Sequence, residues 1–181
     1  PRAALGLVHV VRGDEQRDPL GGKLEQEVPE VAAGHGVICV DSLITGSLDN
    51  IASLRGHSRF RFVHHDIIDP IDVTGPLDEI YNLASPAASL CGQVDPIHTF
   101  RTCTEGSLSL LGLAARKSAR ILLGSGSEVY GDPSIHPQTE DYWGNVNPIG
   151  PRSSLTAGGS TSWGLRPPGA RLRFLRAGRL D

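Results

Sequence analysis

One segment constrains the fold of this chain more than any other: an apolar triplet, residues 121–123, followed by glycines and polar side chains. A compact apolar run is typical of a strand covered on both faces, and glycines after it allow a sharp turn or a close approach to a ligand. The polar groups then stand at the carboxyl end of the strand, where open α/β sheets bind ligands. They are Ser125, Ser127, Glu128 and Tyr130. A simple Gly/Ser turn is the alternative interpretation.

Three further segments have the pattern of strands, at residues 37–40, 60–64 and 80–83. Between the last of them and residues 121–123, apolar residues at helical spacing predict a helix over residues 96–118. Strands that alternate with helices imply a parallel sheet with right-handed crossovers. The sequence therefore predicts an α/β fold with a partial Rossmann-like, doubly wound parallel sheet of about four strands.

The two ends of the chain are weakly specified. Residues 1–30 contain a short apolar run at 8–11 but no strongly patterned element, and they lack the Gly-rich motif that follows the first strand of a dinucleotide-binding fold. Residues 155–181 are rich in Gly, Pro and Arg, and we expect them to be a disordered tail. We expect residues 31–154 to form the partial Rossmann domain.

Composition limits the classes of function. The 181 residues carry a formal net charge of −3, which predicts no general attraction to nucleic acid or to anionic membranes. Three cysteines without C-x-x-C spacing argue against a disulfide framework and a zinc site, and favour the cytoplasm. No apolar run approaches the roughly 20 residues of a membrane span. The start at Pro1 and the absence of methionine suggest a fragment.

Asp41 is the candidate for ligand binding that the strand pattern itself provides. It ends the strand at residues 37–40, where a carboxylate can accept hydrogen bonds from both hydroxyls of an adenosine ribose and repel a 2′-phosphate. A turn or helix cap is the alternative. His64 ends the next strand, and His65 and Asp66 follow it, but a metal site there is disfavoured because adjacent strand residues point to opposite faces.

Several of these segments closely resemble the UDP-glucuronate decarboxylases, NAD-dependent enzymes of the extended short-chain dehydrogenase/reductases, in the epimerase/dehydratase family. The resemblance covers about residues 31–154 and is lost at both ends, which suggests a truncated and degenerate copy. The matching segments are residues 37–41, 45–46, 64–66, 81–87, 108–115, 125–131 and 140–152.

The resemblance implies both a reaction and the residues that serve it. These enzymes oxidise the C4 hydroxyl of UDP-glucuronate with bound NAD, release carbon dioxide from the β-keto acid and reduce the ketone to give UDP-xylose. The implied cofactor contacts are Asp41, Thr45, Gly46, Asp66, Ile67, Leu83, Ala84 and Ser85, with Asp66 accepting from the adenine amino group and Ile67 packing on the ring. The implied substrate contacts are Pro86, Ala87, Ser127, Glu128 and Arg152. Family members are often homodimers.

Most of the family's catalytic side chains are replaced here. Glu128 matches the family's glutamate, but the threonine, tyrosine and lysine positions are Gly126, Leu155 and Gly159. An asparagine position on the central helix is Cys103. The three positions of the Gly-rich turn, counted back from Asp41, fall near Arg17, Leu20 and Lys23. We therefore expect weak NAD binding and no decarboxylase activity; a non-catalytic remnant with weak nucleotide or partner binding is the alternative to the family's enzyme.

Overall fold

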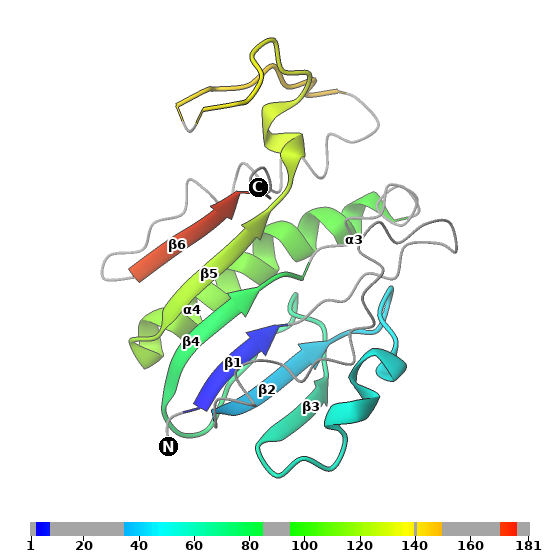
Figure 1. Cartoon of the computed structure of the whole chain (residues 1–181), viewed down its shortest axis with the longest axis vertical. Coiled ribbons are helices and arrows are strands. Elements are labelled where there is room, and N and C mark those ends of the chain that lie inside the picture. Colours follow the sequence, from blue (N-terminus) through cyan, green and yellow to red (C-terminus); the bar gives the residue numbers. More distant parts are fainter. Residues whose placement is uncertain (1–2, 8–34, 85–94, 140, 150–170, 177–181) are drawn as a thin grey trace.

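Six parallel strands form a single sheet in the order β3-β2-β1-β4-β5-β6 (Figure 1). The computed structural model describes residues 3–7, 35–84, 95–139, 141–149 and 171–176. The strands are β1 (Ala3–Leu7), β2 (Gly36–Asp41), β3 (Phe60–His64), β4 (Leu77–Asn82), β5 (Arg120–Ser125) and β6 (Arg171–Arg176). This order is that of a doubly wound Rossmann fold, so the predicted fold class is confirmed.

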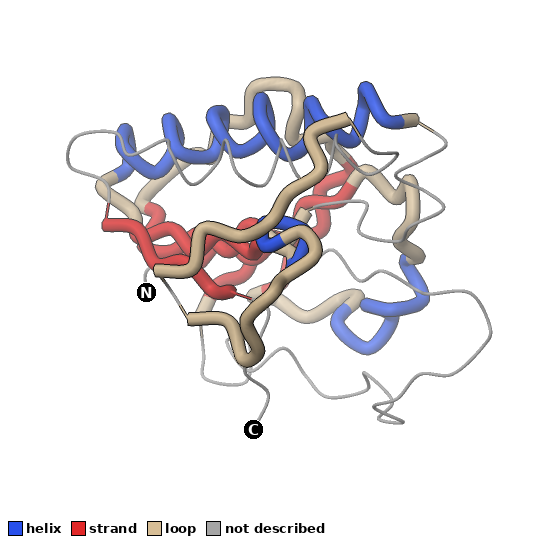
Figure 2. Tube along the Cα trace, turned by 90° about the horizontal axis from the view of Figure 1, so that it is seen from above, coloured by secondary structure: helices blue, strands red, loops and turns tan. Residues whose placement is uncertain are grey.

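In the described part of the chain, the helical layer comes from one long stretch between β4 and β5. It consists of α3 (Pro96–Arg101), a π-helical turn η2 (Thr102–Gly106) and α4 (Ser107–Lys117), which together match the predicted helix over residues 96–118. Figure 2 shows this stretch lying across one face of the sheet. Two short 3-10 helices, η1 (Leu48–Leu54) and η3 (Ser127–Tyr130), follow β2 and β5. None of the helices in the described part of the chain is long and apolar enough to span a bilayer.

The core lies between α4 and the central strands. Leu110 and Leu113 on α4 are fully buried, as are Ile80 on β4 and Ile121 on β5. Burial of each such side chain contributes about 1.5–3 kcal/mol, so this helix–sheet contact supplies much of the stability of the described residues. The apolar spacing that predicted the helix is thus the spacing that its buried face requires.

The expectation of about four strands was wrong, because β1 and β6 extend the sheet at both ends of the chain. β1 pairs with β2 on one side and β4 on the other. A strand with ladders on both sides gains hydrogen bonds that no local pattern reveals. β1 at Ala3–Leu7 also precedes the apolar run at residues 8–11, which was the more strand-like segment in the sequence. Basic and apolar residues alternate over residues 171–174, a strand signal that the basic composition concealed. The six residues Arg171–Arg176 of the tail that we expected to be disordered form β6, which pairs with β5. The proposed boundaries at residues 30 and 154 stay predictions.

Candidate functional site

A pocket opens at the carboxyl ends of β2, β3 and β4. Its empty volume is about 380 Å³, including the open mouth. Parallel strands end at the same edge of a sheet, so the residues that follow them converge there. The lining residues are Val40, Asp41, Ser42, Ile44, Thr45, His65, Asp66, Ile67, Ala84, His98 and Thr102. Five residues that the sequence assigned to the cofactor are therefore brought together: Asp41, Thr45, Asp66, Ile67 and Ala84.

Asp41 is a buried carboxylate, 8% exposed, at the last position of β2. Its Oδ1 accepts a hydrogen bond of 2.7 Å from the backbone N–H of Leu43, which adopts a left-handed conformation with φ 57°. Gly46 closes over the same carboxylate, since a Cβ at position 46 would lie 3.0 Å from Oδ2 and 3.3 Å from Oδ1. The loop after β2 thus fixes the carboxylate and packs tightly at position 46, where an added side chain would require the carboxylate to move by a few tenths of an ångström.

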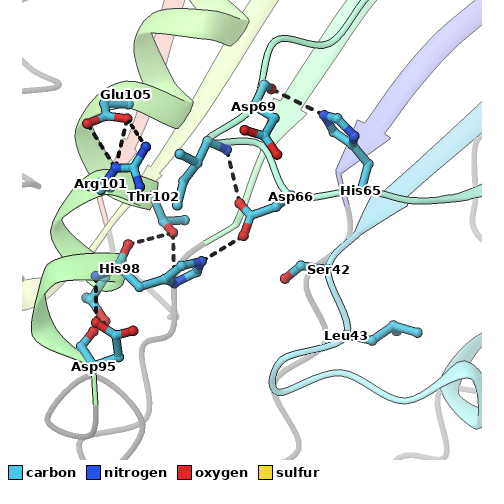
Figure 3. A network of polar contacts seen from close by, with 12 residues as sticks. Ser42, Leu43, His65, Asp66, Asp69, Asp95, His98, Arg101, Thr102 and Glu105 are labelled. Atoms are coloured by element: carbon cyan, nitrogen blue, oxygen red, sulfur yellow. Dashed lines mark hydrogen bonds and ion pairs between the residues drawn. The ribbon is translucent and has the colours of Figure 1, made fainter.

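Asp66 forms the polar wall of the pocket together with His98 on α3. Its Oδ1 accepts from the backbone N–H of Ile68 at 3.0 Å, and its Oδ2 lies 2.7 Å from His98 Nε2 (Figure 3). The two side chains are 27% and 26% exposed. Burial raises the pKa of Asp66, but the Ile68 and His98 hydrogen bonds and the charges of His98 and His65 outweigh it, so its pKa lies below the ordinary value. Asp66 is therefore an ionised acceptor at neutral pH.

Ile67 fixes the pocket to the helical layer. It is 4% exposed and packs against the backbone at Gly106 in the π-helical turn, where an added Cβ would lie 2.6 Å from Ile67 Cδ1. The glycine is therefore needed for close packing, and a π-turn inside a helix often accompanies a functional site. Ile67 contributes its remaining surface to the pocket, and its contact with an adenine ring stays a prediction.

The loop after β5 holds the predicted catalytic residue away from this pocket. Ser127 and Glu128 lie on η3, and neither lines the pocket. The Glu128 side chain turns back over Gly126, so that an added Cβ at position 126 would overlap Glu128 Oε2. The ring of Tyr130, the last residue of η3, stacks on that of Tyr142 with centroids 6.1 Å apart, which ties the following polar loop back to η3.

The remaining predicted residues divide into two groups. Leu83 follows β4, is largely exposed and contacts Gly124 rather than the pocket. Gly46 contacts Asp41 and reaches the pocket only through it. The positions that lie outside the described residues are Arg17, Leu20, Lys23, Ser85, Pro86, Ala87, Arg152, Leu155 and Gly159.

The sequence did not predict that His98 and Thr102 line the pocket. Both lie in the helical stretch between β4 and β5, His98 in α3 and Thr102 at the start of η2. His98 is 32 residues from Asp66 in the sequence. The only local signal is the helix start, where Asp95 Oδ1 accepts from the backbone N–H of His98 at 2.8 Å. Within the described residues, no three His, Cys, Asp or Glu side chains gather to hold a metal ion.

Comparison with known proteins identifies the relatives of this chain. A family model described as GDP-mannose 4,6 dehydratase matches residues 29–157. UDP-glucuronic acid decarboxylase 1 of Danio rerio is 50% identical over 125 residues, which are 69% of this chain and 29% of that protein. UDP-glucuronic acid decarboxylase 6 of Arabidopsis thaliana is 52% identical over 122 residues, 67% of this chain and 35% of the relative. The chain thus spans about a third of the length of these relatives.

Solved structures share the fold at low sequence identity. A dTDP-glucose 4,6-dehydratase of Streptomyces venezuelae with NAD and TYD bound has a TM-score of 0.69 at 23% identity, over 97% of this chain and 55% of that chain. The UDP-Glc/GlcNAc 4-epimerase of Campylobacter jejuni has a TM-score of 0.69 at 15% identity, over 97% and 53% of the two chains. At these identities the likeness concerns the fold alone.

Proposed function

We propose that this chain, which belongs to the GDP-mannose 4,6 dehydratase family, binds the adenosine part of NAD in the pocket at the ends of β2–β4 and does not decarboxylate UDP-glucuronate. The observation that carries the binding proposal is the convergence of two fixed carboxylates, Asp41 and Asp66, on one pocket. The observation against catalysis is Gly126, where the resemblance requires a hydroxyl.

The pocket residues fit an adenosine. Asp41 offers carboxylate oxygens to the two ribose hydroxyls, and its negative charge repels a phosphate at the 2′ position. Asp66 accepts from the exocyclic amine of adenine, while Ile44, Ile67 and Ala84 supply apolar contacts for the faces of the base. The sequence of residues 8–34 lacks the Gly-rich motif whose backbone N–H groups bind a pyrophosphate, so we expect the affinity to be weak.

The residues that would perform the chemistry are mostly absent. Bound NAD would supply hydride acceptance and return, but the chain must supply a proton acceptor and a group that positions the substrate oxygen. Leu155, Gly159 and Gly126 carry none of the required functional groups. General acid/base groups contribute about 10²–10⁴-fold each to rate, so their combined loss removes most of the turnover, even allowing for non-additivity. Glu128 remains, but a carboxylate is a weak base for an alcohol.

The second candidate function is the family's own reaction, conversion of UDP-glucuronate to UDP-xylose and carbon dioxide. Two UDP-glucuronic acid decarboxylases share 50% and 52% identity with this chain over 125 and 122 aligned residues, which favours this function. The retained Glu128 favours it as well. In that case Ser127, Glu128 and, outside the described residues, Pro86, Ala87 and Arg152 contact the nucleotide sugar. Cytoplasmic location and homodimer formation belong to the same proposal.

Two measurements on the purified chain separate these functions. Calorimetry with NAD should show binding weaker than about 10 μM and still weaker binding of the 2′-phosphorylated cofactor; sub-micromolar NAD affinity would contradict the binding proposal. Incubation with NAD and UDP-glucuronate should give no UDP-xylose or carbon dioxide above background. Turnover that disappears in Glu128→Ala would establish the second candidate instead.

A further inference from the structure

His98 joins the helical layer to the polar wall of the pocket. It lies in the first turn of α3, and its Nε2 lies 2.7 Å from Asp66 Oδ2, a shorter bond than the 3.0 Å one from the Ile68 backbone N–H to Oδ1. An ionised carboxylate only accepts hydrogen bonds, so His98 Nε2 must carry the hydrogen that is donated. The bond is therefore charge-assisted, a class roughly twice as strong as neutral hydrogen bonds.

The helix holds the imidazole in place from behind. The backbone N–H of His98 donates to the N-cap Asp95, and the hydroxyl of Thr102 donates to the His98 carbonyl at 2.9 Å. Thr102 Oγ1 also lies 3.5 Å from His98 Nδ1, on the side of the ring away from Asp66. One turn further along the helix, Arg101 pairs with Glu105 and does not compete for Asp66 (Figure 3). The donor is thus preorganised, with little rotamer freedom left to lose.

The two bonds to Asp66 leave it in one orientation. Ile68 N–H holds Oδ1 and His98 holds Oδ2, so the carboxylate cannot rotate toward solvent without losing a bond. The Asp66 carboxylate can therefore only accept hydrogen bonds from a ligand in the pocket. A purine with an amino group at C6 donates to such a wall, whereas a purine with a carbonyl at C6 places a second acceptor against it, which costs free energy.

We propose that His98 is a positioning residue that orients Asp66 and thereby makes the pocket prefer 6-amino purines over 6-oxo purines. This inference rests on the proposed binding of the adenosine part of NAD. It adds a specificity determinant on α3 to the contacts that strands β2 and β3 provide. The imidazole acts through Asp66 and need not touch the ligand itself.

The test compares AMP with IMP by calorimetric or NMR titration of the full chain. The two nucleotides differ only at the C6–N1 edge of the base, where AMP has an amino group and an acceptor nitrogen, and IMP has a carbonyl and an N1–H group. The unaltered chain should bind AMP about tenfold more tightly than IMP, the effect of one hydrogen bond to a charged group. In His98→Leu the preference should fall to below about threefold, mainly through weaker AMP binding. His98→Gln, whose amide nitrogen can reach the carboxylate, should restore most of the preference.

Controls keep a structural effect distinct from this role. His57→Leu changes a histidine in the turn before β3 whose Nδ1 accepts from the backbone N–H of Arg59 and which does not line the pocket, and it should leave the AMP-to-IMP ratio within about twofold. If His98→Leu does not fold, His98→Asn keeps a polar group but is too short to donate to Asp66, and it should show the same loss.

Each outcome decides between the two proposals. An unchanged ratio in folded His98→Leu or His98→Asn, or an equal loss for both nucleotides, overturns the role of His98 while leaving adenosine binding intact. Failure of the unaltered chain to bind either nucleotide overturns the proposed function, and with it the inference. A fall in the ratio that His98→Gln reverses supports both.

Discussion

The pocket after β2 and β3 and the loop after β5 lie at the same edge of one sheet, yet they differ in how they hold the residues assigned to them. In the pocket, Asp41 and Asp66 are fixed by backbone donors, by Gly46 and by a histidine from the helical layer. In the loop, Ser127 is exposed and Glu128 turns back over Gly126, where the resemblance requires a hydroxyl.

From this difference we infer that position at the carboxyl edge does not by itself make a catalytic site. The fold brings every strand end to that edge, but binding and catalysis depend on the side chains placed there and on what supports them. The pocket retains both the side chains and their support. The loop has Glu128 but, at Gly126, lacks the hydroxyl that the resemblance predicts there. The comparison can be tested by changing one region at a time.

The largest expected effect is on nucleotide binding. Asp41→Ala removes the carboxylate that we expect the ribose hydroxyls to meet, and should weaken NAD binding about 10- to 100-fold, because hydrogen bonds to charged groups are strong. The matched change in the loop, Glu128→Ala, should alter NAD binding less than about twofold. Calorimetry measures both. Equal losses in the two variants would remove the distinction between the regions.

A second test concerns the support beneath the pocket. Gly106→Ala places a Cβ against buried Ile67 and should lower the free energy of unfolding by about 1–3 kcal/mol through overpacking. Gly112→Ala is the matched control in the same helical stretch, since the nearest atom is the movable Arg116 Nη1 at 3.3 Å. It should raise stability by about 0.5–1 kcal/mol, because alanine favours the helix over glycine. Urea unfolding measures the free energy of unfolding of both variants. Similar changes in the two would show that the packing of Ile67 does not require a glycine at position 106.

Acid should weaken the pocket through Asp66. Its pKa is lowered in the folded chain, so its ionised form stabilises the fold above the ordinary pKa of 3.8, and this contribution is lost as pH falls through the lower folded value. The difference in unfolding free energy between the unaltered chain and Asp66→Asn should therefore shrink as the pH falls from about 5 to about 2, because the carboxylate becomes protonated over this range. Chemical denaturation at several pH values measures it. A difference independent of pH would show that the His98 and Ile68 bonds do not favour the ionised form.

The smallest effect is expected in the loop. Gly126 is exposed and has φ −94° and ψ 164°, a conformation that threonine adopts readily. In Gly126→Thr the Glu128 carboxylate, the end of a flexible side chain, must move, and stability should change by less than about 0.5 kcal/mol. Restoring this hydroxyl should produce no UDP-xylose, because Leu155 and Gly159 remain. Measurable turnover in this variant would mean that the loop lacked one group rather than several.

The sequence alone determined the elements whose signals are local. The apolar runs predicted β2, β3, β4 and β5, and helical spacing predicted the stretch from α3 to α4, because each pattern reflects the burial of one face of one element. Asp41 could be assigned to a ligand site for the same reason, since a residue at the end of a parallel strand lies at the carboxyl edge in any such sheet. Its predicted contact with ribose still awaits the binding measurements.

Only the tertiary structure decided which distant residues meet. The pairing of His98 with Asp66 across 32 residues depends on how α3 docks and rotates on the sheet, and no periodicity contains that information. The same is true of Ile67 against Gly106, and of β1, a short segment that becomes a strand because β2 and β4 each provide a partner ladder. Local patterns record which face of an element is buried, whereas contacts between elements depend on packing that the whole chain establishes together.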